Sequence, residues 1–349
     1  MTNEIDKRYN PANEVMKYQF LLELEHSKEG KDPKTVREYM NAIHEFEIAT
    51  SFKDFKKYCQ DWSIDFKDYI SSKKNRQTGE EISKSYYSHY VCFVRQFFEW
   101  LVKQKDYKHL ENKGINKLYI TKNERKQGKA TGIQKSYLII EILETIRKML
   151  ENTEIEMRDK AIISLFLLTT PRIKAVMTAR VKSIQFMREY NSYAFIQSSN
   201  LVETKFRNNI TSFFISQTQD LIDNVINWQQ YLKNKGFKDK DYLFPKIVPS
   251  FDKNGISISE LKKEKIKSTT TIREIFERAF KNNNLEYINP HSFRHTISKA
   301  MKRDVNHTRL IPALHENFGH SKGLAHIIST YGRDYLIEQA EVLRDFKFE

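Results

Sequence analysis

Three short segments of the sequence hold side chains that are suited to chemistry on a phosphate ester. They are Arg172 in the first segment, His291 and Arg294 in the second, and His320 and Tyr331 in the third. An arginine guanidinium keeps its charge and donates two parallel hydrogen bonds to phosphate oxygens. Histidine exchanges protons near neutral pH, and a tyrosine oxygen can attack an electrophile once its proton has left.

The spacing within the second segment adds to this signal. His291 and Arg294 are three residues apart, so on a helix they project from the same side. An H-x-x-R pattern alone is weak, because it occurs by chance in many chains. Three such segments in a fixed order, with the tyrosine near the end of the chain, form a more specific pattern.

These segments resemble the phage integrase, Xer and Cre group of tyrosine recombinases. That family carries a T-G-L-R-type turn, an H-x-L-R-H-T box, and an L-G-H-S segment followed by a tyrosine. This sequence reads T-T-P-R, H-S-F-R-H-T and F-G-H-S, ending in S-T-Y-G, over about residues 160–335. The resemblance implies a helical core-DNA-binding domain and an α+β catalytic domain. It also implies that DNA strands are broken and rejoined through a tyrosine.

The resemblance also implies a role for each residue. Arg172 and Arg294 would hold the charge of the pentacoordinate transition state, and His320 would donate one more hydrogen bond to phosphate. Tyr331 would be the nucleophile. An unperturbed phenol has a pKa of about 10, so a base must help its proton leave, and His291 would serve as that base.

One further role falls on a lysine. The family protonates the leaving 5′-oxygen with a lysine from a β-hairpin. Lys205 is the only lysine in the turn between two predicted strands, in the stretch LVETKFRNN. The resemblance implies that Lys205 protonates the leaving oxygen. Without the resemblance, it would be interpreted as an ordinary exposed lysine in a turn.

The sequence departs from the family pattern at several places. Pro171 replaces a small apolar residue before the first arginine, and Ala175 stands where family members often carry a glutamate. Tyr331 follows His320 by eleven residues, which is longer than the commonest spacing. Tyr335, one helical turn further, therefore remains a competing nucleophile.

Metal and thiol chemistry find little support. His295 lies four residues after His291, as in a helical metal pair, but no carboxylate or third ligand stands at a useful spacing. Cys59 and Cys92 form neither a metal motif nor a disulfide framework, and we expect them to be small core residues. We therefore expect no metal and no nucleotide cofactor.

The elements before these segments are predicted to be helical. Apolar residues recur at helical spacing in the first third of the chain, at Val36, Tyr39, Met40, Ile43 and Phe46, and again at Val91, Val94, Phe98 and Leu101. They predict a compact bundle of four or five helices over about 15–118. We assign residues 1–119 to a helical core-DNA-binding domain.

A basic stretch follows at 120–136 and lacks apolar periodicity. Its cations are Lys122, Arg125, Lys126, Lys129 and Lys135, against the single acidic residue Glu124. This composition is typical of a linker between domains. It could be a solvated tether or a strap along the phosphate backbone of DNA, and we count these cations as candidate DNA contacts.

Residues 137–349 are predicted to form the catalytic domain, mostly helical with a small antiparallel sheet. Ser136 can cap a helix over Ile139–Leu150, and a buried helix is expected at 159–170, stopped by Pro171. The runs at 192–197 and 210–216 predict a β-hairpin. Thr271 and Glu274 predict a capping box at the start of a later helix.

The composition of the chain indicates what kind of partner it binds. Lys and Arg number 59 against 45 Asp and Glu, giving a formal charge of +14 and a pI near 9.4. Such a surplus favours a polyanion, because each phosphate neutralised releases counterions. No apolar run is long enough to span a bilayer, and the polar N-terminus carries no signal peptide. We expect a reduced cytoplasmic protein associated with the nucleoid, and no membrane.

The sequence thus predicts a site-specific recombinase that acts on double-stranded DNA with paired inverted core sites. We expect a homo-tetramer on DNA, and a monomer or weak dimer when free. One rival is a type IB topoisomerase or hairpin-forming resolvase, which uses the same chemistry without exchanging partners. The other is a DNA-binding factor that has lost catalysis.

The end of the chain bears on assembly. An apolar stripe at near-helical spacing follows the nucleophile, at Tyr335, Leu336, Ala340, Leu343 and Phe346. A stripe of this kind must be buried somewhere. By resemblance we expect it to dock on the next protomer, and the alternative is that it packs on its own domain.

Overall fold

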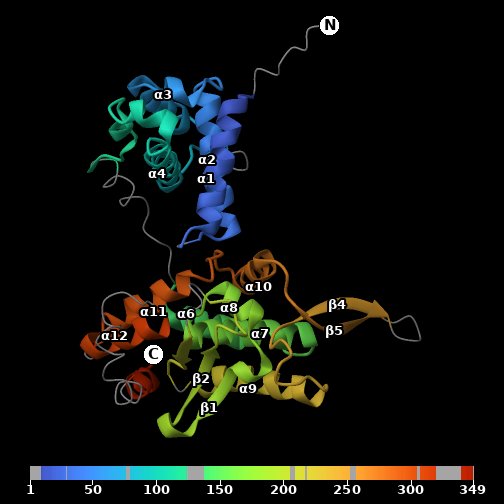
Figure 1. Ribbon diagram of the computed structural model, residues 1–349. Helices are drawn as coiled ribbons and strands as arrows, with labels where there is room; N and C mark the ends of the chain where they lie inside the picture. The colour runs from blue at the N-terminus through green and yellow to red at the C-terminus, as the bar shows by residue number, and fades with distance from the viewer. Residues whose placement is uncertain are drawn as a thin grey trace. The chain divides into compact units, whose positions relative to one another are not determined.

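The chain folds into two compact units, residues 1–133 and 134–349 (Figure 1). This computed structural model describes residues 9–28, 30–75, 79–122, 124, 137–204, 209–216, 218–251, 257–304, 307–319 and 339–348. The described residues are mostly helical with small antiparallel sheets. The predicted fold class is therefore confirmed. None of the described helices is long and apolar enough to cross a bilayer.

The first unit is a helical bundle, as the apolar periodicity predicts. Its helices are α1 (Pro11–His26), α2 (Pro33–Ala49), α3 (Gln60–Ser71) and α4 (Lys84–Leu101), with 3-10 turns at Phe55–Lys57, Lys105–Leu110 and Ile115–Leu118. Asn10 and Asp32 cap α1 and α2 through side-chain hydrogen bonds, and each is followed by a proline at the first helical position. These caps set where both helices begin.

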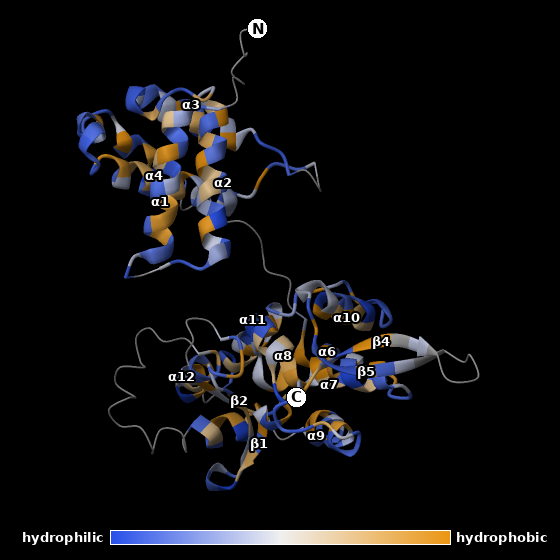
Figure 2. Cartoon of the chain, turned by 45° about the vertical axis from the view of Figure 1, so that its right-hand side comes forward, coloured by the Kyte–Doolittle hydropathy of each residue, from blue (hydrophilic) through white to orange (hydrophobic). Residues whose placement is uncertain are grey.

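Aromatic side chains fill the core of this unit. Phe46 of α2 is fully buried, and its ring lies 5.0 Å from that of Phe98 on α4 and 5.3 Å from that of Phe66 on α3. Cys59 and Cys92 are only half-buried, so they are not the core residues that we expected. Figure 2 shows apolar and polar residues on the same helices, as expected for amphipathic elements around one core.

The second unit carries the three segments of interest. Its helices are α6 (Ile139–Lys148), α7 (Glu154–Thr169), α8 (Ile173–Thr178), α9 (Gln219–Asn234), α10 (Thr269–Lys281), α11 (Ser292–Met301) and α12 (His307–Asn317). Its strands are β1 (Ile184–Met187), β2 (Ser192–Gln197), β3 (Ile210–Phe213), β4 (Pro245–Phe251) and β5 (Ser257–Lys265). Helix α7 is buried along most of its length and lies at the centre of this unit.

The predicted hairpin is confirmed, and the sheets extend beyond it. Strands β2 and β3 pair antiparallel, with Gln197 opposite Ile210. Strand β1 pairs with the other side of β2, and β4 pairs with β5 alone among the strands that the structure describes. Strands β1, β4 and β5 were not predicted. Strand β1 is short, and β5 is rich in lysine and glutamate. Figure 1 shows the β4–β5 hairpin extending away from the helices.

Several predicted helix ends are wrong. Helix α10 begins at Thr269 with Ser268 as its cap, so the capping box predicted at Thr271 is not used. Four hydroxyl residues stand in a row there, and the pattern does not select among them. Leu150, expected on the face of α6, lies beyond the end of that helix and is 62% exposed.

Two other helices start elsewhere than predicted. Helix α6 is capped at Leu138, whose amide N–H donates to Glu141 Oε2 at 2.7 Å, and Ser136 lies outside the described residues. Helix α7 starts five residues before the predicted 159. A capping box between Thr153 and Glu156 closes its first turn.

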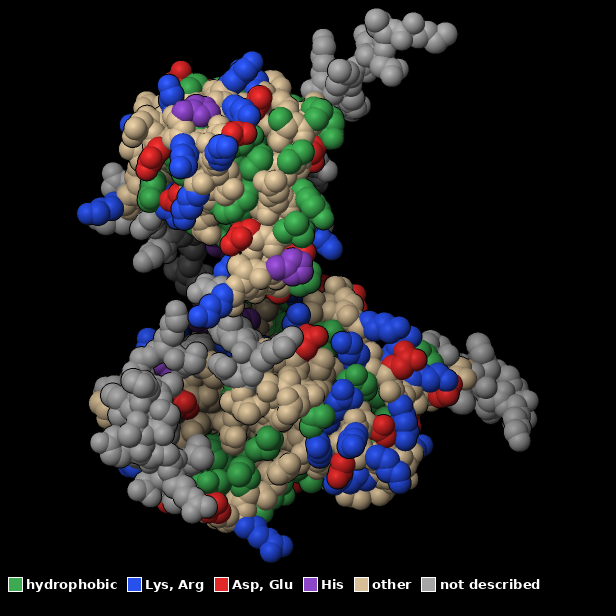
Figure 3. All heavy atoms as spheres, viewed as in Figure 1, with side chains coloured by type: hydrophobic (Ala, Val, Ile, Leu, Met, Phe, Trp, Pro, Cys, Tyr) green, Lys and Arg blue, Asp and Glu red, His purple; other side chains and the backbone are tan. Residues whose placement is uncertain are grey.

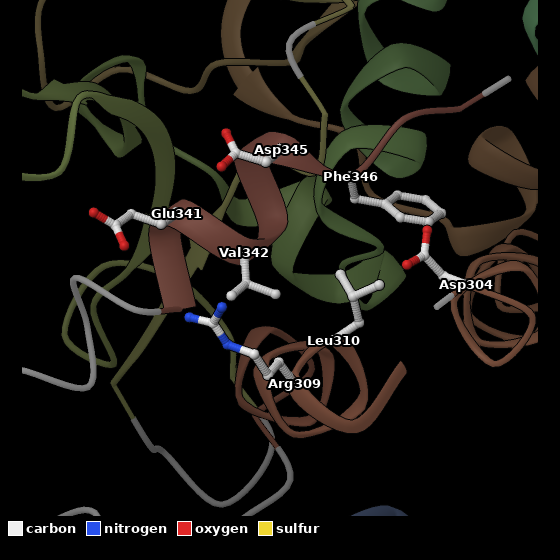
Figure 4. A pocket seen from close by; sticks show the side chains of 7 residues that line it. All are labelled: Asp304, Arg309, Leu310, Glu341, Val342, Asp345 and Phe346. Carbon is white, nitrogen blue, oxygen red and sulfur yellow. The ribbon is translucent and has the colours of Figure 1, made fainter. Parts of the chain in front are cut away.

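The described end of the chain packs on its own domain. Residues 339–345 are helical, and Ala340, Leu343 and Phe346 are buried in the core of the second unit. Figure 4 shows Val342 and Phe346 near Leu310 of α12, around a pocket of about 160 Å³. Ala340, Leu343 and Phe346 therefore pack on their own domain, which was the alternative to the expected docking on a neighbouring protomer. Tyr335 and Leu336 lie outside the described residues.

Candidate active site

Arg172 stands at a sharp turn between α7 and α8. Helix α7 ends where the amide N–H of Thr170 donates to Phe166 O at 2.9 Å, and Pro171 cannot continue the helix. Thr170 has the left-handed conformation, with φ 45° and ψ 49°. Arg172 then serves as the N-cap of α8 and is half-buried. This turn brings the arginine to the edge of the domain core.

Arg294 comes to the same turn from α11, far along the chain. Its side chain is buried, and Nε donates to the main-chain oxygen of Thr170 at 2.8 Å. The guanidinium carbon lies 4.5 Å from the centre of the Phe318 ring, just after α12. Arg294 thus joins the α7–α8 turn, α11 and the end of α12.

The two arginines share one electrostatic environment. Burial, and next the charge of Arg172, lower the pKa of Arg294 to about 9. Burial also lowers the pKa of Arg172. Both guanidinium groups still carry their protons at neutral pH. Among the described residues, no ion pair joins Arg172 to a carboxylate, so this charge is available for a bound anion.

His291 completes the cluster at the start of α11. It is exposed, and its amide N–H donates to Asn289 Oδ1 at 3.0 Å. Partial burial lowers the pKa of its ring, as do the charges of Arg294, His295 and Arg172. The ring is therefore neutral at pH 7 and can accept a proton. We call the two arginines Arg172 and Arg294, together with the neutral His291 beside them, the cation cluster.

The structure describes both positions at which the sequence departs from the family pattern next to Arg172. Ala175 is buried inside α8, and Pro171 is buried at the turn. The role of Thr170 was missed, although the sequence held a signal. The family box has glycine where this chain has Thr170, and a glycine often marks a positive φ. His295 is exposed, with its ring 5.8 Å from that of His291.

Several predicted site residues are not placed. Lys205, His320, Tyr331 and Tyr335 lie outside the described residues, as do Arg125, Lys126, Lys129 and Lys135. Lys122 is described and exposed. Within the described ranges, no group of three His, Cys, Asp or Glu side chains could hold a metal ion.

The one acidic residue of the basic stretch is held by the first unit. Glu124 accepts hydrogen bonds from the Tyr87 hydroxyl at 2.8 Å and the Thr121 amide at 2.6 Å, and pairs with Lys67 at 3.2 Å. Burial opposes ionisation, but these contacts outweigh it and lower the pKa of Glu124 to about 2. The stretch therefore starts at a fixed point, which its composition did not predict.

The comparison with protein-family models identifies one family. Residues 138–333 match the model of the phage integrase family. No curated protein matches the sequence. Among solved structures, a XerH site-specific recombinase in a post-cleavage complex with palindromic difH substrate is 13% identical, with a TM-score of 0.56. The alignment covers 90% of this chain and 76% of that one.

Two further structures are similar at the same level. The Tn1549 transposon integrase in complex with transposon right end DNA is 12% identical, with a TM-score of 0.57, over 94% of this chain and 99% of that one. A lambda integrase tetramer bound to a Holliday junction is 11% identical, with a TM-score of 0.54, over 90% and 79%. At these identities the similarity extends to the fold alone.

The Thr170 hydroxyl gives a first testable prediction. It is buried without a hydrogen-bond partner among the described residues. We expect Thr170→Val to raise the free energy of unfolding by about 1 kcal/mol, because it removes this hydroxyl. The matched control Thr169→Val should lower it by about 1 kcal/mol, since Thr169 Oγ1 donates to Leu165 O at 2.9 Å. Urea unfolding measures both, and destabilisation by Thr170→Val would contradict the prediction.

The cation cluster gives a second prediction. The pKa of His291 should lie below its usual value of about 6.5, and it should rise in Arg172→Ala, because a nearby positive charge disfavours the protonated ring. An NMR titration of the histidine ring protons measures this pKa. Lys148→Ala removes an exposed cation of the same unit and should leave it unchanged. An equal pKa in the wild type and Arg172→Ala would show that the two side chains are not coupled.

Proposed function

Because the chain belongs to the phage integrase family of tyrosine recombinases, we propose that it is an active site-specific DNA recombinase of the integrase or transposon type. It cleaves and rejoins DNA through a 3′-phosphotyrosine intermediate and a Holliday junction. The observation that carries this proposal is the cation cluster. Two guanidinium groups and a neutral histidine meet at one place, and they come from segments more than 100 residues apart.

The cluster suits the charge of the reaction. A phosphodiester under attack gains negative charge on its non-bridging oxygens, and fixed cations stabilise that charge without reorganisation. Arg294 is held at the α7–α8 turn by the hydrogen bond from its Nε to the Thr170 carbonyl, and a guanidinium can donate parallel hydrogen bonds to phosphate oxygens. Arg172 supplies the second guanidinium, and His320 is assigned a further hydrogen bond.

Residues of this chain can supply and accept every proton that moves in the proposed reaction. The Tyr331 hydroxyl oxygen attacks phosphorus, and its proton passes to His291, whose pKa is lowered. The bond from phosphorus to the 5′-oxygen breaks, and that oxygen takes a proton from Lys205. The phosphotyrosine bond conserves the energy of the phosphodiester. Rejoining therefore reverses the same steps, and no metal or nucleotide is needed.

The charge of the protein supports binding to DNA. The chain carries a formal charge of +14. Figure 3 shows Lys and Arg side chains gathered on the second unit, over α9 and the base of the β4–β5 hairpin. Exposed lysines of α9, of the segment after it and of β5 are Lys233, Lys235, Lys238, Lys240 and Lys263, of which Lys235 and Lys263 pair with Glu154 and Asp241. We propose that residues 120–136 form a strap along the phosphate backbone between a domain at 1–119 and a catalytic domain at 137–349.

The proposed partner is duplex DNA with paired inverted core sites. Recombination joins two such sites, so four protomers would act together on them, and the free protein would be a monomer or weak dimer. The tetramer of lambda integrase on a Holliday junction supports this arrangement. We propose that the protein acts in the cytoplasm, at the nucleoid.

Trapping the covalent intermediate tests the function. Sequencing the DNA beside the gene, in search of paired inverted repeats, would supply candidate core sites for a nicked duplex whose cleaved strand cannot be rejoined. The wild type should accumulate a covalent adduct on a 3′-phosphate, and peptide mapping should place the bond on Tyr331. Tyr331→Phe should form none. An adduct that survives in Tyr331→Phe and vanishes in Tyr335→Phe would assign the nucleophile to Tyr335.

The arginines provide the matched variants. Arg172→Ala and Arg294→Ala should slow adduct formation by roughly 100-fold or more, because each removes charge stabilisation of the transition state. DNA affinity should change little, since many other lysines and arginines bind phosphate. Lys148→Ala, an exposed cation, should alter neither property. Equal losses of binding and cleavage would show that the arginines are not catalytic, and inhibition by EDTA would contradict the metal-free reaction.

A further inference from the structure

Asn317, the last residue of α12, is paired with strand β3 through its side chain. It is 1% exposed. Its Oδ1 accepts from the amide of Phe213 at 2.8 Å, and its Nδ2 donates to the carbonyl of Phe213 at 2.8 Å. The main-chain oxygen of Asn317 accepts from Ser212 Oγ at 2.8 Å. The amide side chain thus bonds to β3 as a neighbouring strand would.

The same side chain holds the end of the chain. Gln339 is 2% exposed, and its Nε2 donates to Asn317 Oδ1 at 3.1 Å and to Ala313 O at 3.5 Å. Four residues later, the carbonyl of Leu343 accepts from the amide of Ser216 at 2.8 Å. Helical residues 339–345 are therefore bonded both to α12 and to the segment after β3. We call Asn317 and Gln339, with their contacts to Phe213, the amide clasp.

The amide clasp adjoins the cation cluster. Phe318 directly follows Asn317, and its ring lies under the guanidinium of Arg294. On the other side, the amide of Ile215 donates to Leu168 O at 2.7 Å, two residues before Thr170. Thr170 in turn accepts from Arg294. A short series of contacts therefore runs from the clasp to Arg294 by two routes.

The chain leaves the clasp along a restricted path. Gly319 has a φ of 63°, and a Cβ atom there would lie 2.3 Å from Cδ1 of Ile210 on β3. A side chain here would require Ile210 to move, and the positive φ would strain any residue other than glycine. The sequence places His320 immediately after this point, and Tyr331 eight residues before Gln339.

The choice of buried amides argues for positioning. An apolar residue at position 317 would leave the amide and the carbonyl of Phe213 without these partners, so the Asn317 side chain both satisfies β3 and ties it to α12. Fully paired polar networks are directional, and they specify one arrangement of the elements that they join. Here they fix the two points between which the sequence carries His320 and Tyr331.

We infer that Asn317 and Gln339 are positioning residues. Asn317 fixes Phe318 against Arg294 and ties the start of the segment carrying Tyr331 to strand β3, and Gln339 ties the end of that segment to Asn317. This inference rests on the proposed function of Tyr331. The clasp touches no substrate. It acts by fixing the two ends of the segment that carries Tyr331 next to the residues that hold Arg294.

A double-mutant cycle on the cleavage rate tests the clasp. The variants are Asn317→Ala, Gln339→Leu and the pair, measured on the nicked duplex at saturating DNA. Asn317→Ala should slow adduct formation by about 100-fold, because a misplacement of about 1 Å costs that much. Gln339→Leu should slow it by about 10-fold, and the pair should be no slower than Asn317→Ala, since residues of one network are not additive. DNA affinity should be unchanged.

A control separates positioning from general stability. Gln229 is a buried amide of the same unit that donates to Val181 O at 2.6 Å and Ile184 O at 3.0 Å. Gln229→Leu should lower the unfolding temperature as much as Gln339→Leu and leave the cleavage rate unchanged. The inference is overturned if Gln229→Leu slows cleavage equally, if the clasp variants cleave at the wild-type rate, or if their effects multiply.

Limited trypsin digestion tests the clasp apart from the proposed reaction. The sequence offers trypsin sites at Lys322 and Arg333. Asn317→Ala and Gln339→Leu should speed cleavage at these sites relative to Gln229→Leu, and equal rates would overturn the inference. A wild type that forms no adduct, while the clasp variants still show faster digestion, would refute the proposed function and leave the anchoring in place.

Discussion

The hydrogen bond from Arg294 Nε to the Thr170 carbonyl is the contact on which the candidate site depends. It joins residues 124 positions apart and requires helix α7 to end in a left-handed residue. Arg294 is buried by this contact, and burial lowers its pKa. A buried cation is costly unless a partner offsets the desolvation. The carbonyl of Thr170 and the ring of Phe318 supply part of this compensation for Arg294.

Local patterns in the sequence predicted the elements that local physics determines. The apolar spacing of Val36 to Phe46 predicted α2, and the β-branched and aromatic run at 192–197 predicted β2. The order of the three segments predicted that Arg172, His291 and Arg294 belong together, and the structure brings these three into one cluster. Lys205, His320 and Tyr331 remain predictions. Residue types and spacing predict these elements and this grouping because each motif is short and contiguous.

Other features depend on contacts that a linear pattern does not contain. Strand β5 is polar by composition and becomes a strand only because β4 pairs with it. The left-handed Thr170 is stabilised by Phe166 and by Arg294, one turn before it and 124 residues after it. Asn317 would be an ordinary helix end without Phe213 across from it. For Ala340, Leu343 and Phe346 the apolar stripe predicted burial correctly but not the surface that covers them, because spacing alone does not identify that surface.

The β4–β5 hairpin has a consequence for how the protein behaves at high concentration. No other described strand pairs with either outer edge of this two-stranded ribbon, and such edges invite a strand from another molecule. Pro245 and Pro249 remove amide donors from β4, while Lys262, Lys263 and Lys265 place charge along β5. Both edges are therefore poor templates for added strands. The ribbon can project into solvent without seeding aggregation of the chain.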